Sequence, residues 1–286
     1  MIIRIEEKSG FCYGVVRAVE MADSMLDKGE SLYSLGQIVH NEEEVLRLEK
    51  KGLVTISHED LPALHNCKLL IRAHGEPPST YEIAKRNRIE LIDGTCPIVS
   101  KIQVAIAQKA KEPDAIIVIF GKLDHPEVEG LFGQSPKNTY VIGSIEEIKE
   151  LPESSNVHLY SQTTMDSKAF QNLIEVLEKK QTDEHGRLLV HNTICGHVSH
   201  RRPGLQKFAS ENDLIIFVGG KNSSNGKVLY QVCRDVNPRT YYVGSPDELV
   251  KHWFEGAKTV GVAGATSTPR WQIDTITDKI REIDSL

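Results

Sequence analysis

Three short segments indicate the fold: CYGVV at residues 12–16, CPIVS at 96–100 and CGHVS at 195–199, each a cysteine with valine three positions later. Each segment leads into a stretch of helical character and then into an apolar strand that ends in glycine. The distances from the cysteine to that glycine are 24, 25 and 25 residues. Because self-similarity at a fixed period is typical of a repeated structural unit, we interpret the chain as three copies of one unit.

The second half of each unit repeats as well, since another strand runs into a polar loop and another helical stretch follows. The expected helices cover residues 16–26, 79–86, 99–110, 167–180, 203–210 and 270–283, and the expected strands cover 31–36, 69–74, 115–121, 157–163, 214–220 and 259–267. Alternating strands and helices are typical of βαβ units with parallel sheets. The sequence therefore predicts an α/β fold of three similar domains.

We place these domains at residues 13–96, 97–193 and 194–286, with residues 1–12 packing against the third. Three equivalent units in one chain are expected to pack around a pseudo-threefold axis. Functional groups of α/β units gather at the carboxyl ends of the strands, so the three repeat cysteines are expected to converge near that axis.

Composition excludes several classes of protein. The 286 residues are 40% hydrophobic and 26% charged, with a net charge of −6, as in an ordinary globular protein. This charge argues against a nucleic-acid partner. No apolar run approaches the ~20 residues that cross a bilayer, so we expect no membrane partner and a cytoplasmic location, where thiols stay reduced.

Three of the five cysteines, Cys12, Cys96 and Cys195, stand at repeat-equivalent positions, each beside a helix N-terminus, which favours the thiolate form and metal binding. Three thiolates without a fourth ligand do not suit a closed zinc site. They suit a cubane iron–sulfur cluster with one iron left open. The alternative is three buried, inert cysteines. Cys67 and Cys233 have no repeat partners, and we expect them to be packing residues.

Polar side chains follow the strands of each unit. His40, His74 and His125 lie in such loops, together with residues 223–225 and 266–267. Neutral donors beside helix N-termini bind phosphate, so these loops predict a phosphate-binding cage. A P-loop and a dinucleotide fingerprint are both missing from the sequence, so the electrons are expected to come from an external redox protein.

One carboxylate accompanies this cage. Glu127 stands two residues after His125 at a predicted helix start, where it is either a helix-dipole partner or a proton donor. Thr163 and Thr164 follow the next strand, and their hydroxyls either cap the strand end or relay that proton.

The chain resembles the 4-hydroxy-3-methylbut-2-enyl diphosphate reductase family (IspH/LytB family) over nearly its whole length. The motifs that carry the resemblance are GFCYGVVRAV, GQIVHN, RAHG, DGTCPIVSK, GKLDHPEVEG, SQTT, GGKNSSN and GATSTP. The resemblance implies an oxidoreductase of the non-mevalonate isoprenoid pathway, which removes the allylic hydroxyl of its diphosphate substrate to give isopentenyl and dimethylallyl diphosphates. It implies an external electron donor such as ferredoxin or flavodoxin.

The resemblance also implies a role for each matching residue. A [4Fe–4S] cluster enclosed by the three domains is expected on Cys12, Cys96 and Cys195, with its fourth iron open to substrate. Glu127, Thr163 and His125 are the expected catalytic residues. The expected substrate-binding residues are His40, His74, His125, Thr163, Ser223, Ser224, Asn225 and Ser267.

Two segments depart from the family pattern. Residues 196–200 read GHVSH where the family often has an Ala-Thr stretch, so no role is carried over to that loop. The late motif is GATSTP where the family more often has GASAP, and we place the phosphate-binding serine at Ser267 rather than at Thr266.

Two other functions remain open from the residues alone. One is a non-redox [4Fe–4S] hydro-lyase, which needs no electron donor. The other is a non-enzymatic module that binds a phosphate ligand. If a donor protein docks, Arg201, Arg202 and Lys207 are the expected basic patch.

Overall fold

A computed structural model describes residues 1–150, 156–180, 187–199 and 201–285. Within this part the chain forms three four-stranded sheets, with strand orders β3-β2-β4-β5, β7-β6-β8-β9 and β11-β10-β12-β1. Parallel pairs occur in all three sheets: β4 pairs with β5, β6 with β7 and β8, β8 with β9, β10 with β11 and β12, and β1 with β12. The predicted α/β fold with three similar parallel-sheet units is confirmed.

The strands and helices have these bounds. The strands are β1 (Ile2–Ile5), β2 (Leu32–Leu35), β3 (Leu53–Ile56), β4 (Lys68–Ile71), β5 (Glu90–Asp93), β6 (Ala115–Phe120), β7 (Thr139–Ile142), β8 (Asn156–Ser161), β9 (Leu188–Val190), β10 (Leu214–Val218), β11 (Thr240–Val243) and β12 (Thr259–Gly264). The α-helices are α1 (Tyr13–Leu26), α2 (Glu42–Lys50), α3 (Pro78–Arg86), α4 (Pro97–Lys109), α5 (Pro126–Phe132), α6 (Ser167–Lys180), α7 (Gly196–Ser199), α8 (Arg201–Ser210), α9 (Ser224–Val236) and α10 (Arg270–Ser285). Short 3-10 helices are η1 (Leu61–Ala63), η2 (Pro136–Asn138), η3 (Ile145–Glu150), η4 (Pro246–Glu248) and η5 (Lys251–Phe254).

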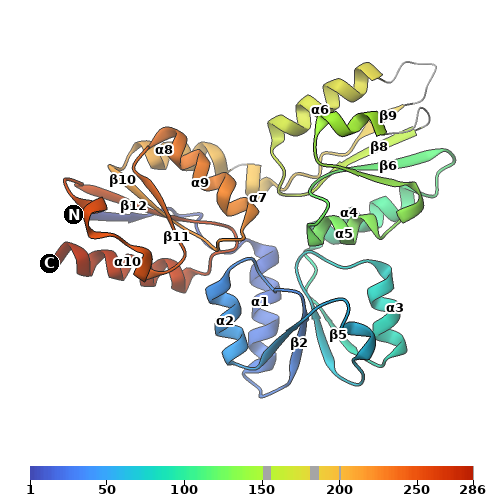
Figure 1. The fold of residues 1–286 in the computed structure, drawn as a ribbon, viewed down its shortest axis with the longest axis horizontal. Coiled ribbons are helices and arrows are strands. Elements are labelled where there is room, and N and C mark those ends of the chain that lie inside the picture. The colour runs from blue at the N-terminus through green and yellow to red at the C-terminus, as the bar shows by residue number, and fades with distance from the viewer. Residues whose placement is uncertain (151–155, 181–186, 200, 286) are drawn as a thin grey trace. The chain divides into compact units, whose positions relative to one another are not determined.

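The same strand order recurs in all three sheets, and the N-terminal strand completes the third. β1 pairs in parallel with β12, from Ile2 opposite Thr259 to Ile5 opposite Val262. Figure 1 shows β1, in blue, beside the red strands of the C-terminal sheet. The third unit is therefore a circular permutation of the other two, with its last strand supplied by the start of the chain.

The central strands are buried on both faces, which explains their continuous apolar sequences. In β6, Val118 and Phe120 pack with Phe170 and Leu173 of α6 on one face of the sheet. The intervening residues of β6 pack on the other face, against α4 and α5. Side chains of a strand alternate between the two faces of its sheet, so this sheet is the middle layer between two layers of helices.

The C-terminal sheet is built in the same way. Leu214, Ile216 and Val218 of β10 share a core with α10, whereas Ile215 and Phe217 share a core with α8 and α9. Within the described residues, none of the helices is both long enough and apolar enough to cross a membrane.

The chain forms two compact units, Met1–Thr55 with His200–Leu286, and Ile56–Ser199. The domain limits predicted from the repeat, and the pseudo-threefold arrangement, stay predictions.

Candidate active site

The three repeat cysteines are held by the same backbone hydrogen bond. The N–H of Cys12 donates to the carbonyl of Thr266 at 3.1 Å, that of Cys96 to Ala73 at 3.0 Å, and that of Cys195 to Thr163 at 2.8 Å. Each acceptor stands two residues beyond the end of a strand: Thr266 follows β12, Ala73 follows β4 and Thr163 follows β8. The cysteines are therefore equivalent in three-dimensional structure as well as in spacing.

Each of these cysteines also precedes a helix. Cys12 is the N-cap residue of α1 and has extended backbone, Cys96 is the N-cap residue of α4, and Cys195 stands directly before α7. All three are half-buried, and no disulfide joins any of the five cysteines of the chain. Helix N-termini favour thiolates, so this donor set fits a thiolate-bound metal cluster. Burial raises the pKa of Cys233 to about 12 and also raises that of Cys67, as suits packing residues.

In the Ile56–Ser199 unit, the predicted proton donor is fully enclosed. Glu127 lies in the first turn of α5 and is 2% exposed. Its Oε1 accepts the N–H of Thr163 at 2.6 Å, and its Oε2 accepts the Thr163 hydroxyl at 2.7 Å. Burial raises the pKa of Glu127, and the two hydrogen bonds from Thr163 oppose that rise.

Thr163 thus connects the carboxylate to a cysteine, because its carbonyl accepts the N–H of Cys195. The adjacent Gln162 is buried, and its Oε1 accepts the N–H of Lys122 at 3.1 Å. Its Nε2 donates to the hydroxyl of Thr164 at 2.9 Å. This glutamine, which the sequence reading missed, holds the 121–125 and 162–164 loops together.

Two predicted histidines also meet in this unit. The rings of His74 and His125 lie edge to face, with centroids 5.3 Å apart. His125 caps α5, because its Nδ1 accepts the N–H of Glu127 at 3.1 Å. This contact assigns the proton of neutral His125 to Nε2.

In the other unit, the predicted phosphate-binding residues form one polar cluster. Ser223 caps α9 by accepting the N–H of Gly226 at 3.0 Å, and its hydroxyl lies 2.9 Å from that of Ser267. The Asn225 amide Nδ2 donates to the Thr266 hydroxyl. Ser223, Asn225 and Ser267 are each at least nine-tenths buried, and Ser224 begins α9. Since Thr266 also accepts the N–H of Cys12, this cluster is continuous with the cysteine loop.

A buried acceptor in this cluster indicates a ligand. Among the described residues, Asn225 Oδ1 has no hydrogen-bond partner. The two ends of an amide are distinguished only by their hydrogen bonds. With the amide turned over, Oδ1 accepts from the Thr266 hydroxyl, and the unused buried group becomes an N–H donor, as a phosphate oxygen requires.

His40 lies beside this cluster, across a close backbone contact. A Cβ added to Gly220 would lie 2.5 Å from the His40 carbonyl oxygen and 2.7 Å from the Asn41 Cα. Asn41 caps α2, and its Nδ2 donates to Oε1 of Gln272 in α10 at 2.8 Å. The sequence reading missed Asn41 and Gln272, although a cap residue directly after His40 was a signal for the start of α2.

The structure therefore gathers the predicted site residues into two groups, one in each unit. Met1–Thr55 with His200–Leu286 holds the first group: Cys12, His40, Ser223, Ser224, Asn225 and Ser267. Ile56–Ser199 holds the second: His74, Cys96, His125, Glu127, Thr163 and Cys195. That both groups act on one substrate stays a prediction.

The expected basic patch is wrong for Arg201. This side chain is 4% exposed, and its Nη2 donates to Oε2 of Glu6 at 2.8 Å. The same Glu6 oxygen accepts the hydroxyl of Ser9, and the Ser9 hydroxyl accepts the N–H of Gly264. Arg201 therefore anchors the loop that leads to Cys12, and it is not available on the surface. Of the atypical 196–200 loop, residue 200 lies outside the described residues.

The fold and these two groups define an α/β protein with repeat-equivalent cysteines, a buried carboxyl and a phosphate-type polar cluster at its strand ends. Residues 3–281 match the family described as LytB protein, and the chain belongs to this family.

Relatives and solved structures agree. The chain is 46% identical over 282 residues to a 4-hydroxy-3-methylbut-2-enyl diphosphate reductase of Bacteroides fragilis, covering 98% of this chain and 97% of the relative. It is 45% identical to the enzyme of that name from Phocaeicola vulgatus, over 95% and 96% of the two chains.

Two solved structures are similar over nearly the whole chain. One is described as (E)-4-hydroxy-3-methyl-but-2-enyl diphosphate reductase, the terminal enzyme of the non-mevalonate pathway, with a TM-score of 0.76, 34% identity and coverage of 99% and 100%. The other is the E-1-hydroxy-2-methyl-but-2-enyl-4-diphosphate reductase of Plasmodium falciparum, with a TM-score of 0.84, 29% identity and coverage of 97% and 87%.

Proposed function

We propose that this chain reduces 4-hydroxy-3-methylbut-2-enyl diphosphate to isopentenyl and dimethylallyl diphosphates. Two electrons and two protons enter, the C–O bond of the allylic hydroxyl breaks, and water leaves. The observation that carries the proposal is the shared anchoring of Cys12, Cys96 and Cys195 on the loops after β12, β4 and β8. The near full-length relatives that bear the reductase name support it.

The three cysteines are the proposed ligands of a [4Fe–4S] cluster. When bound, the cluster supplies the electrons, which it receives from an external donor such as ferredoxin or flavodoxin. The half-buried positions of the cysteines, each beside a helix N-terminus, suit thiolate ligands.

Glu127 is the proposed proton donor. Because burial raises its pKa, the carboxyl is biased towards the protonated form that a donor needs. The Thr163 N–H occupies Oε1, which leaves Oε2 as the atom that carries the proton. The Thr163 hydroxyl serves both states of Oε2, because it donates to the carboxylate and accepts from the acid.

Ser223, Asn225 and Ser267 are proposed to bind the diphosphate, with Ser224 and His40 beside them. Hydroxyl and amide donors at the start of α9 suit a phosphate group. His74 and His125 are proposed to line the substrate site near Glu127. Burial of these groups excludes water and strengthens their electrostatic contacts with substrate.

An anaerobic assay tests the function directly. The reconstituted protein is given the substrate with a chemical reductant, with a reduced donor protein, or with neither, and products are identified by mass. Turnover that requires reductant and yields both five-carbon diphosphates is expected. Turnover without reductant would favour the hydro-lyase, and binding without turnover under any condition would favour the phosphate-binding module.

A further inference from the structure

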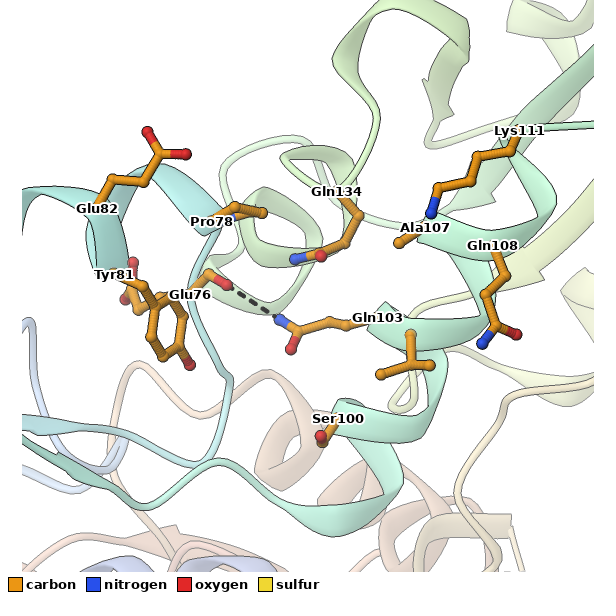
Figure 2. A pocket seen from close by; sticks show the side chains of 11 residues that line it. Glu76, Pro78, Tyr81, Glu82, Ser100, Gln103, Ala107, Gln108, Lys111 and Gln134 are labelled. Carbon is orange, nitrogen blue, oxygen red and sulfur yellow. Dashed lines mark hydrogen bonds between the residues drawn. The ribbon is translucent and has the colours of Figure 1, made fainter.

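A glutamine outside the predicted site lies on the helix that follows Cys96 and approaches both the His74 loop and the Glu127 helix of the Ile56–Ser199 unit. Gln103 lies on α4, seven residues after Cys96, which is the N-cap residue of this helix. It is 8% exposed, and its Nε2 donates to the backbone carbonyl of Glu76 at 3.3 Å. Figure 2 shows this contact, with the Gln103 side chain reaching from α4 towards the loop before α3.

Two glycines leave room for this side chain. A Cβ on Gly75 would lie 2.6 Å from Gln103 Nε2, and a Cβ on Gly130 would lie 3.0 Å from the same atom. Gly75 directly follows His74, and Gly130 lies three residues after Glu127 on α5. The amide of Gln103 therefore fills the slot between the His74 loop and the Glu127 helix.

Glycine is favoured at positions 75 and 130 for different physical reasons. Gly75 has a φ of +70°, which favours glycine whatever its neighbours. Gly130 lies inside α5, where glycine is less favourable than alanine. A Cβ at Gly130 would meet the Gln103 amide at 3.0 Å and the Gly75 carbonyl oxygen at 3.3 Å, so the close approach of the amide and of the Gly75 backbone together explains the glycine.

The surroundings of Glu76 fix the other side of the slot. Its carboxylate is buried, and Oε2 lies 2.7 Å from His58 Nε2 and 3.2 Å from the Thr80 hydroxyl. Arg72 lies 3.8 Å from the other carboxylate oxygen. Arg72 and Glu76 flank His74 in sequence, so their ion pair joins the two ends of the loop that carries His74. Gln103 contacts this loop at the backbone of Glu76.

One end of Gln103 is reached from solvent. A cavity of about 510 Å³ is lined by Gln103 and Glu76 together with α3 and α4 side chains such as Tyr81, Gln108 and Lys111. Figure 2 shows Gln103 in the wall of this cavity, with Gln108 further along the same helix. Gln108 is exposed and serves as a matched control, since it has the same side chain, helix and cavity.

We propose that Gln103 is a positioning residue that sets the spacing between the Cys96 helix, the His74 loop and the Glu127 helix. The inference rests on the proposed function for its effect on turnover. Its effect on the geometry of the unit does not depend on that function. A displaced group of about 1 Å costs on the order of a hundredfold in rate, so a change of spacing is expected in kcat more than in KM.

A size-exchange experiment tests this inference. Gln103→Ala leaves a gap, Gly130→Ala presses on the amide, and the double variant places a methyl group in the vacated space. Each single change is expected to lower kcat by about tenfold to a hundredfold. The double variant is expected to recover part of that loss, while Gln108→Ala stays within twofold of the parent.

A second readout needs no cluster and no substrate. The imidazole signals of His74 and His125 are followed by ¹H–¹⁵N NMR in the cluster-free protein. They are expected to shift in both single variants and to return towards parental positions in the double variant. Gln103→Met, which keeps the chain length without the N–H donor, provides a folded comparison if Gln103→Ala does not fold.

Strictly additive losses in the double variant, or histidine signals that move no more in Gln103→Ala and Gln103→Met than in Gln108→Ala, would overturn the inference. If the parent protein shows no reductase activity, the proposed function fails. The NMR comparison then still decides whether Gln103 sets the spacing.

Discussion

Thr163 binds both oxygens of Glu127, through its N–H at 2.6 Å and its hydroxyl at 2.7 Å. The carbonyl of the same threonine accepts the N–H of Cys195 at 2.8 Å. One residue therefore orients the buried carboxyl and anchors a cysteine loop. The proposed proton donor is fixed in this way relative to a proposed cluster ligand inside one compact unit.

Glu127→Gln is expected to lower turnover by about a hundredfold to ten-thousandfold, because the amide cannot deliver a proton. The amide keeps the size of the carboxyl, so iron content and the affinity for inorganic diphosphate are expected to stay parental. The matched control is Glu129→Gln, an exposed acid on the same helix. Turnover of Glu127→Gln equal to that of Glu129→Gln would remove Glu127 from the mechanism.

Thr163→Val is expected to move the pH dependence of turnover. The Thr163 hydroxyl lowers the pKa of Glu127, against the rise caused by burial, so its removal raises that pKa further. A proton donor loses activity as pH rises through its pKa, and the alkaline limb of the kcat–pH profile is expected to move to higher pH. A limb that stays in place or moves to lower pH would contradict this assignment.

Asn225→Asp is expected to abolish binding of inorganic diphosphate, because a carboxylate would replace a buried amide beside Ser223 and Ser267. Calorimetric titration measures the affinity, and KM for the substrate is expected to rise with little change in iron content. The control is Asn222→Asp, which adds the same charge at an exposed position in the loop that leads into α9. Equal losses in both variants would mean that charge in the loop, rather than contact at Asn225, decides binding.

Gly220→Ala is expected to destabilise the fold by about 1–3 kcal/mol, since its Cβ would overlap backbone atoms of His40 and Asn41. Gly204→Ala is the control, because no atom lies within 4 Å of that Cβ and Gly204 is inside α8. It is expected to stabilise the protein by ~0.5–1 kcal/mol. Denaturant unfolding of both variants measures these changes. An unchanged midpoint for Gly220→Ala would show that the Gly220 loop moves away from the backbone of His40 and Asn41 at little cost in free energy.

Stability is expected to fall as the pH drops below ~6.5, the ordinary pKa of histidine. His158 is fully buried, 3.1 Å from His191 and 3.1 Å from Glu112, which also pairs with Lys109. Burial lowers the pKa of both histidines, so the unfolded chain takes up protons first and the folded state loses stability. His158→Gln is expected to flatten this dependence.

Much of the fold was predictable from the sequence because its signals are local. Cysteine-to-glycine spacing and buried apolar runs gave three parallel-sheet units, and strands such as 115–121 agree with β6 to within one residue. The short outer strands β1, β3, β5, β7, β9 and β11 were missed. Their half-exposed sequences carry weaker periodicity than central strands.

The supporting contacts of the site were less accessible from sequence. Asn41 with Gln272, and Arg201 with Glu6, join residues 231 and 195 positions apart, and no local pattern pairs them. Arg201 was assigned to a surface patch because charge alone carries no information on burial. Gln103 was missed because its role depends on two glycines in other elements.

The most direct test of the central claim is the content of iron and acid-labile sulfide per chain in anaerobically reconstituted protein. About four of each are expected, as one [4Fe–4S] cluster requires. Cys12→Ser, Cys96→Ser and Cys195→Ser are each expected to lose most of both, while Cys67→Ser retains them. Little iron and no sulfide in the parent protein would contradict the account, because the three equivalent cysteines would then hold no cluster.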